Sequence, residues 1–159
     1  MSLVRSRRPT DLDAAWATAT RRGEGFVLIQ DYVTEADQGE KRIVWLDGEV
    51  LGGYLRRRAP GEFRHNLKQG GTIEAMNVTD EERETIRTLT PHLLRAGIRF
   101  AGLDLIGSQI IEVNALNPGG TYHTDRLTGS RLAERVIEHF ETNRTAHPLE
   151  QLEWVPPAR

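Results

Sequence analysis

The sequence predicts an α+β fold in which a mixed, mainly antiparallel sheet is covered by helices. Apolar segments of strand length occur in adjacent pairs, and amphipathic helical patterns stand before, between and after them. A chain of 159 residues with 38% hydrophobic residues can bury one core. We place the domain at residues 10–141, after a tag or disordered lead-in at 1–9 and before a polar, proline-containing tail at 142–159.

Composition excludes several classes of function. The chain has no cysteine, which excludes disulfides, thiolate metal sites and a cysteine nucleophile. The 21 basic and 23 acidic residues give a net charge of -2, which argues against bulk attraction to nucleic acid or to a membrane surface. The sequence has neither an apolar run near the roughly 18 residues of a membrane helix nor an apolar signal segment. We therefore expect a cytoplasmic protein with no membrane partner.

The N-terminal half is expected to contain one helix followed by three strands. The run 26–32 is apolar and bounded by glycine and charge, which is typical of a buried strand. Between the second and third strands, Asp47-Gly48 readily supplies the positive φ angles of a two-residue hairpin turn. The expected bounds are 10–23 for the helix and 26–32, 41–46 and 49–55 for the strands.

The C-terminal half is expected to contain a helix, a second hairpin and a last helix. Thr79 and Glu82 form a capping box that starts the first of these helices. Apolar residues at helical spacing, Ile86, Leu89 and Leu93, give that helix one buried stripe. The expected bounds are 100–106 and 110–114 for the strands and 132–140 for the last helix.

The segment 56–72 between the two halves is expected to be a mobile loop with a role in function. It contains three consecutive arginines and two glycine-containing turns, and it is long for a simple connection. Its basic residues suit a phosphate or a carboxylate, although a solvated charged edge is the commoner meaning of such a pattern. A nucleic-acid site would normally add several aromatic residues and a wider basic field, so a nucleic-acid binder built on this loop is the weaker alternative and we expect no nucleic-acid partner.

The predicted strands 100–106 and 110–114 carry three oxygen donors. Glu112 and Asn114 share a face because strand side chains alternate. A three-residue turn would place Asp104 opposite Glu112, where a cation such as Mg²⁺ would offset the two like charges. A two-residue turn would instead pair Asp104 with Ile111 and send Glu112 to the other face. Spacing alone leaves both turns open, together with a plain polar sheet face.

A glycine-rich turn follows the last of these donors. Pro118, Gly119 and Gly120 form a turn whose backbone amides are able to hold a carboxylate or a phosphate. A plain surface turn is the commoner meaning of this string when it stands alone.

Seven short motifs occur in a fixed order along the chain. They lie at residues 28–32, 39–42, 47–49, 64–71, 100–104, 112–114 and 117–118. In this order they resemble the C-terminal part of the bacterial glutathione synthetase family, which belongs to the ATP-grasp ligases. The similarity covers residues 10–140 and implies the C-terminal half of an ATP-grasp fold.

The resemblance implies an ATP-dependent carboxylate-amine ligase. In that family ATP phosphorylates the carboxylate of γ-glutamylcysteine, and the amine of glycine then attacks the acyl phosphate. Mg²⁺, or Mn²⁺ in its place, would offset the phosphate charge. The chain would then be a part that is inactive alone and needs a missing N-terminal lobe from the same or another chain.

The resemblance also implies roles for individual residues. Oxygen donors at three positions would bind the metal: Asp104, Glu112 and Asn114. The nucleotide would be bound by Gln30, Asp31, Tyr32, Glu40 and Arg42. Phosphates or the acyl intermediate would face Arg56, Arg64 and Asn66. The substrate end would be formed by Gly70, Gly71, Asn117, Pro118, Gly119 and Gly120.

The substrate end departs from the family pattern. Asn117 stands where the family usually has serine, and Gly119 replaces a small hydroxyl residue. The acid and amine substrates therefore stay open, and an ATP-grasp ligase with another substrate pair is an alternative. A non-catalytic nucleotide-binding module is another alternative, and a homo-oligomer is compatible with either.

Overall fold

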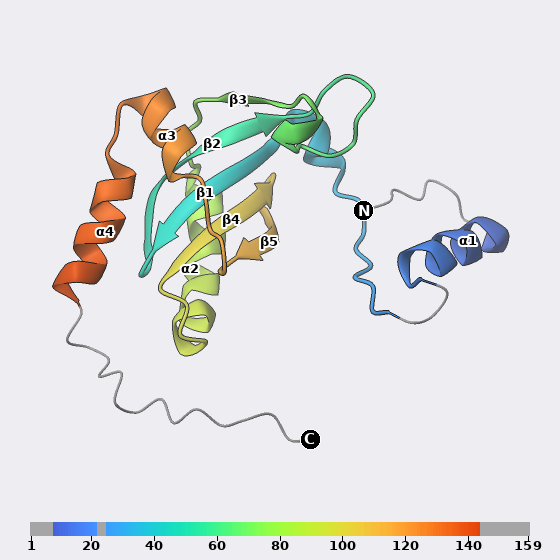
Figure 1. Ribbon diagram of the computed structural model, residues 1–159, viewed down its shortest axis with the longest axis horizontal. Coiled ribbons are helices and arrows are strands. Elements are labelled where there is room, and N and C mark those ends of the chain that lie inside the picture. Colours follow the sequence, from blue (N-terminus) through green and yellow to red (C-terminus); the bar gives the residue numbers. More distant parts are fainter. Residues whose placement is uncertain (1–7, 22–24, 144–159) are drawn as a thin grey trace.

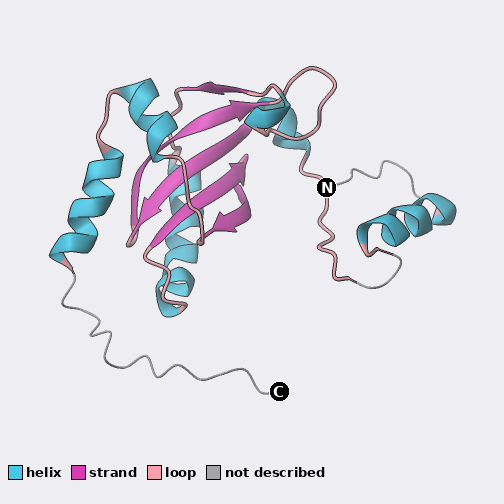
Figure 2. Cartoon of the chain, in the orientation of Figure 1, coloured by secondary structure: helices cyan, strands magenta, loops and turns pink. Residues whose placement is uncertain are grey.

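The protein forms one antiparallel sheet with helices on both faces (Figures 1 and 2). The computed structural model describes residues 8–21 and 25–143. The strands are β1 (Glu40–Leu46), β2 (Glu49–Arg57), β3 (Thr72–Glu74), β4 (Phe100–Ile106) and β5 (Gln109–Asn114), in the order β3-β2-β1-β4-β5. The helices are α1 (Pro9–Ala19), α2 (Asp80–Arg95), α3 (Thr121–Thr128) and α4 (Leu132–Thr142), with short 3-10 helices η1 (Thr34–Gln38) and η2 (Leu67–Gln69). The predicted α+β class is confirmed.

The hydrophobic core lies between the sheet and α2. Alternate side chains of β1 and β4 pack against the apolar stripe of α2. The side chains on this face of the two central strands are therefore buried. The buried residues of this core are Ile43, Trp45, Ile86, Leu93, Ala101, Leu103 and Leu105. The opposite face is covered at one end by α3 and α4, which pack over β2. The rest of that face is left for polar side chains.

The β1–β2 hairpin forms as the sequence predicts. Leu46 pairs with Glu49 across a two-residue turn, in which Asp47 has φ 50° and Gly48 has φ 100°. Two successive positive φ angles match the right-handed twist of the strands, and Asp-Gly adopts them at low cost.

The predicted capping box at the start of α2 is also present. The Thr79 hydroxyl accepts a hydrogen bond from the Glu82 backbone N–H, and Glu82 Oε2 accepts one from the Thr79 N–H. Lys41 Nζ on β1 lies 2.7 Å from Glu82 Oε1. The cap therefore fixes α2 against β1 as well as starting the helix.

The predicted strand at 26–32 is wrong. The segment is not a strand, and Phe26, Leu28 and Ile29 are largely or fully exposed. Within the described part of the chain no sheet edge pairs with it, and an apolar run forms a strand only where a neighbouring strand satisfies its backbone. The sheet still has five strands, because β3 forms at the end of the expected loop, where no strand was predicted.

The expected loop is shorter than 56–72, because Arg56 and Arg57 belong to β2, and η2 and β3 form within its second half. Helix α3 was not predicted. It is short and polar, and Thr124 and Thr128 bond to carbonyls four residues before them, so it carries no long apolar stripe that would reveal it.

Several expectations about the chain ends lie outside the described residues, namely those on 1–7 and 144–159. In the part of the chain that the structure covers, the helices are all too short or too polar to cross a membrane.

Candidate functional site

The polar face of the sheet gathers charged side chains from four strands. Strand alternation puts Glu40 and Arg42 on the face opposite α2, and β2 and β4 present Arg56 and Asp104 to the same face. The pairing is direct, because Glu40 is opposite Arg56 and Arg42 is opposite Asp104. Residues 40, 42, 56 and 104 are thus adjacent although they are far apart in the sequence.

A β-bulge decides which face Glu112 occupies. Ile106 pairs with Gln109, so the turn has two residues, Gly107 and Ser108. The register then shifts, because Leu105 pairs with Ile110 while Asp104 pairs with Glu112. One extra residue in β5, Ile111, causes the shift. The hairpin therefore combines the shorter turn with the pairing that the longer turn predicted.

Asp104 is the most enclosed charged group of this face. Its carboxylate Oδ1 accepts a hydrogen bond from Arg42 Nε at 2.5 Å and forms an ion pair with Arg56 Nη2 at 2.8 Å. Its Oδ2 accepts from Arg42 Nη2 at 2.8 Å and Asn114 Nδ2 at 3.3 Å. The residue is only 1% exposed. Burial alone would lower the pKa of Arg42, but the hydrogen bonds and charge of Asp104 raise it above its ordinary value.

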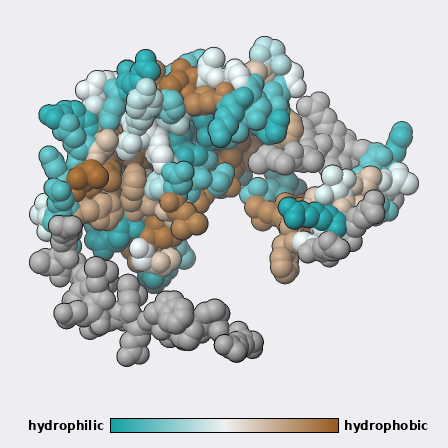
Figure 3. All heavy atoms as spheres, viewed as in Figure 1, coloured by the Kyte–Doolittle hydropathy of each residue, from teal (hydrophilic) through white to brown (hydrophobic). Residues whose placement is uncertain are grey.

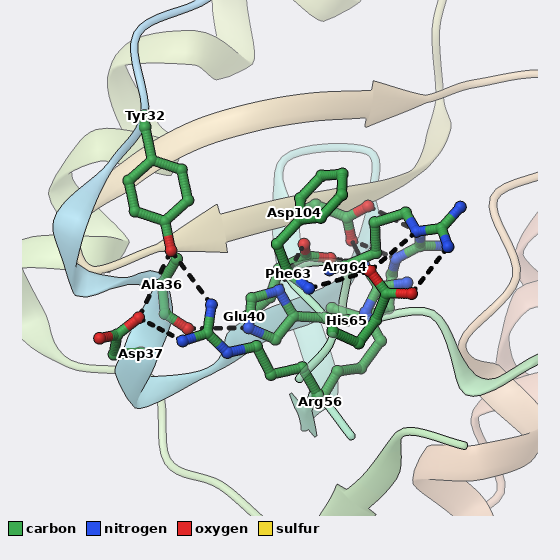
Figure 4. Close-up of polar contacts among 12 residues, drawn as sticks. Tyr32, Ala36, Asp37, Glu40, Arg56, Phe63, Arg64, His65 and Asp104 are labelled. Carbon is green, nitrogen blue, oxygen red and sulfur yellow. Dashed lines mark hydrogen bonds and ion pairs between the residues drawn. The ribbon is translucent and has the colours of Figure 1, made fainter. Parts of the chain in front are cut away.

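Arg56 links Asp104 to Glu40. Its Nη2 forms ion pairs with both carboxylates, and Glu40 Oε2 lies 3.5 Å from His65 Nδ1 on the far side. Figure 4 shows Asp104, Arg56, Glu40 and His65 grouped together between the sheet and the loop. Among the described residues, Arg56 Nε is buried and lacks a hydrogen-bond partner. An unsatisfied buried donor of this kind is costly unless a ligand completes it.

The three predicted metal ligands lie together on the two neighbouring strands. Asn114 contacts Asp104, and the negative charge of Glu112 contributes to the raised pKa of Arg42, which places it beside the same cluster. Glu112 is exposed, so its oxygens are accessible. The part of the chain that is described has no cluster of three or more His, Asp or Glu residues suited to a metal. The donor set of two carboxylates and one amide nevertheless has the oxygen chemistry that a hard cation requires.

The glycine turn predicted for the substrate end lies over this cluster. Arg42 Nη1 donates to the Pro118 carbonyl at 2.8 Å. A Cβ on Gly102 of β4 would lie 2.2 Å from that carbonyl, and one on Gly120 would lie 3.0 Å from Val44. Glycine is therefore required for the turn to approach the sheet so closely. Asn117 is exposed, and a Cβ on Gly119 would make ordinary van der Waals contact with Arg42 Nη1, at 3.7 Å.

The predicted nucleotide hinge approaches the bulged strand. Gln30 Nε2 donates to the Ile111 carbonyl at 3.4 Å, and Asp31 is exposed. The Tyr32 hydroxyl donates to Asp37 Oδ1 at 3.4 Å and accepts from Arg58 Nη1 at 3.1 Å. The hinge residues thus lie at the side of the acidic cluster, with their side chains facing solvent or η1.

The remaining predicted loop residues make contacts within the loop. Arg64 pairs with Glu62 at 2.7 Å, and this hydrogen bond lowers the pKa of Glu62 to about 2. Asn66 caps η2 by accepting from the Lys68 N–H at 3.1 Å. Gly70 ends η2 with φ 83°. A Cβ on Gly71 would lie 2.8 Å from the Arg57 carbonyl, so its close approach is to the backbone of β2.

The burial of His65, a residue of the basic segment 56–72, was not predicted from the sequence. The ring is 5% exposed, and its Nε2 lies 2.8 Å from the Ala36 carbonyl of η1. Burial lowers its pKa below the ordinary value, and the positive charges of Arg58 and Arg56 add to that effect. A cavity of about 720 Å³, lined in part by Asp37, Arg58 and His65, lies at this loop. No sequence pattern signals that a single loop histidine is buried.

Comparison with known proteins identifies the family. The model of the ATP-grasp domain of prokaryotic glutathione synthetase matches residues 2–129. The chain belongs to this family. The resemblance of the motif series is thereby confirmed.

Two curated relatives are the glutathione synthetases of Thermosynechococcus vestitus and of a Nostoc species. The first is 39% identical over 127 residues, covering 80% of this chain and 40% of the relative. The second is 38% identical over 125 residues, covering 79% of this chain and 39% of the relative. The chain therefore spans about 40% of the length of the relatives that it matches.

A solved ATP-grasp structure shares the fold. D-alanine–D-alanine ligase from Bacillus anthracis, complexed with ATP, matches with a TM-score of 0.58 at 18% identity. The match covers 87% of this chain and 49% of the ligase. At this identity the likeness concerns the fold alone, and it agrees with the predicted C-terminal half of an ATP-grasp fold.

Proposed function

We propose that the chain is the ATP- and Mg²⁺-binding part of a carboxylate-amine ligase that resembles glutathione synthetase. The observation that carries the proposal is the cluster on the polar sheet face. Three oxygen donors, Asp104, Glu112 and Asn114, lie beside the cationic side chains of Arg42 and Arg56. Such a cluster suits a divalent cation and a polyphosphate together.

Some of these residues would stabilise charge on the phosphates, and others would position the nucleotide. When bound, ATP supplies the phosphoryl group that activates a carboxylate, and Mg²⁺, or Mn²⁺, offsets phosphate charge. Arg42 and Arg56 stabilise the negative charge that develops on phosphate oxygens, and Arg64 and Asn66 do so from the loop. Gln30, Asp31, Tyr32 and Glu40 position the nucleoside. A side-chain nucleophile is not needed, because the enzyme acts by orientation and electrostatic stabilisation.

The proposed acid and amine substrates are those of the family, although two residues at the substrate end depart from the family pattern. The proposed acid is γ-glutamylcysteine and the proposed amine is glycine, held at Asn117–Gly120 and at the Gly70-Gly71 turn. Because Asn117 and Gly119 depart from the family pattern, another acid or amine is the natural variant of the proposal. The exposed apolar segment 26–32 supports a companion lobe, from the same or another chain, that covers it.

Nucleotide binding by this chain tests the proposal. We expect a non-hydrolysable ATP analogue with Mg²⁺ to stabilise the protein, by about 2.7 kcal/mol at 100 times the dissociation constant. Glu112→Gln should reduce this stabilisation at the same ligand concentration, because a metal ligand loses its charge. The measurement is the analogue-induced shift in thermal unfolding.

Glu74→Gln is the matched control, since Glu74 is also an exposed strand carboxylate but lies on the edge strand β3, paired with Arg57. It should leave the shift unchanged. An equal shift in Glu112→Gln and the wild type would contradict the ligand assignment. A wild-type protein without any shift would contradict nucleotide binding itself.

A further inference from the structure

We propose that Arg42 and Arg56 compete with a divalent cation for the carboxylate of Asp104. A polyphosphate that binds these arginines would release Asp104 for the cation, so that divalent cation and polyphosphate bind cooperatively. This inference rests on the proposed function and adds how the same site is regulated. It follows from the contacts of one carboxylate and of the two guanidinium groups that surround it.

Both carboxylate oxygens of Asp104 already have two partners each, through three hydrogen bonds and one ion pair. A carboxylate offers about four lone pairs, two on each oxygen. Oδ1 receives Arg42 Nε and Arg56 Nη2, and Oδ2 receives Arg42 Nη2 and Asn114 Nδ2. Because the side chain is 2% exposed, solvent has almost no access to these oxygens. A cation that binds Asp104 must therefore displace at least one of these donors.

The amide of Asn114 is engaged in the same way. Its Nδ2 donates to Asp104, and this hydrogen bond orients the amide. Asn114 and Asp104 would bind the same cation. Of the three proposed ligands, only Glu112 is exposed. Without an anion, the cation would meet one accessible carboxylate, which is a weak site on its own.

The other contacts of the two arginines favour their transfer from Asp104 to a bound anion. Arg56 also pairs with Glu40, so it keeps one carboxylate partner after leaving Asp104. Its Nε is buried without a hydrogen-bond partner among the described residues, which leaves a donor that a phosphate oxygen would satisfy. Arg42 Nη1 is held by the Pro118 carbonyl, which keeps the guanidinium at the site.

The consequence is a coupling between two ligands. A polyanion binds better when Arg42 and Arg56 are free of Asp104, and a cation binds better when Asp104 is free of the arginines. Each ligand therefore stabilises the arrangement that the other requires, and the increase in affinity is reciprocal.

Binding of Mn²⁺ alone tests the competition directly, followed by the electron paramagnetic resonance signal of the free ion. Arg56→Gln should bind Mn²⁺ about tenfold more tightly than the wild type, because one of the two cationic side chains that compete for Asp104 is gone. Arg57→Gln is the matched control: it removes the same charge from the neighbouring position, whose side chain bonds to Glu74 and to the Gln38 carbonyl. Its affinity should stay within about threefold of the wild type, since only the screened, long-range repulsion between Arg57 and the cation is removed.

Two further arms complete the test. Adding Asp104→Asn to Arg56→Gln should remove the gain, which shows that the gain acts through Asp104. In the wild type, sulfate should tighten Mn²⁺ binding relative to chloride at equal ionic strength, and this effect should shrink in Arg56→Gln. Circular dichroism checks folding of each variant. If Arg56→Gln does not fold, Arg56→Lys replaces it. This variant keeps the positive charge but loses the planar guanidinium group, and its Mn²⁺ affinity should lie between those of the wild type and the value expected for Arg56→Gln.

The outcomes separate the two proposals. If Mn²⁺ binds equally to the wild type, Arg56→Gln and Arg57→Gln, and sulfate has no effect, the competition is overturned and the metal site stands. If none of these proteins binds Mn²⁺ with or without sulfate, the metal assignment fails and the competition fails with it.

Discussion

At the scale of single residues, His65 shows how burial changes the meaning of a side chain. In the sequence it is one member of a basic loop, whereas in the structure its ring connects η1 to Glu40. The ring faces Arg56 and Arg58 as well as Asp37, so both signs of charge act on it. Burial is the largest effect and favours the neutral ring.

The lowered pKa of His65 makes stability depend on pH. The unfolded chain takes up a proton as pH falls through the ordinary value of about 6.5, whereas the folded protein does so only at lower pH. The free energy of unfolding should therefore fall as pH drops from 7.5 toward 5. In His65→Gln the fall should be smaller, as measured by urea unfolding across this range. An identical pH dependence in the two proteins would contradict the burial of a neutral ring.

At the scale of elements, hairpins and helix ends follow from local sequence. Asp47-Gly48 sets the turn between β1 and β2, and the Thr79–Glu82 box sets the start of α2. The second hairpin is different, because its turn is short and its register is corrected by the bulge at Ile111. The bulge is a feature of how β5 pairs with β4, which the spacing of residues does not encode.

The capping box gives a prediction about α2. Thr79→Ala should lower the free energy of unfolding by about 1 kcal/mol, because the Glu82 N–H loses its acceptor at the helix end. Thr88→Ala is the control, since Thr88 is an exposed residue within the same helix whose hydroxyl bonds to the Glu84 carbonyl. This second change should be neutral or slightly stabilising, because alanine has the higher helix propensity. Urea unfolding measures both, and equal losses would argue against the cap.

At the scale of the whole molecule, an apolar segment is exposed among the residues that the structure describes. Residues 25–32 connect α1 to the sheet and carry Phe26, Leu28 and Ile29, all exposed. Helix α1 adds Leu12 and Trp16, which are about half exposed. Figure 3 shows apolar surface where this connection leaves the body of the protein. A strand-like sequence thus lies exposed, and none of the described strands pairs with it.

The exposed segment should contribute little to folding. Phe26→Ser with Ile29→Ser should change the free energy of unfolding by no more than about 0.5 kcal/mol each, as surface substitutions do. Leu103→Ala, in the core under α2, should cost about 3 kcal/mol. The double variant should also self-associate less, as measured by sedimentation. A large loss of stability in the double variant would mean that the segment is packed against the body in solution.

Much of the fold, and the membership of the candidate site, can be predicted from the sequence. The ordered motifs place Asp104, Glu112 and Asn114 together, and the geometry agrees with that placement. The contacts of Arg64 and Gly71 could not be predicted, because Arg64 pairs with Glu62 within the loop and Gly71 lies close to the Arg57 carbonyl of β2. Loop contacts depend on the conformation of neighbours that sequence periodicity does not describe.

The sequence by itself determined the strands of both hairpins, the start of α2 and the family, because these depend on residues a few positions apart and on the order of short motifs. Only the tertiary structure decided that Ile111 is bulged, that two arginines hold Asp104, and that the run 26–32 is not a strand. The physical reason is that register, ion pairing and burial arise between strands distant in sequence, where the partner of each group sets its energy.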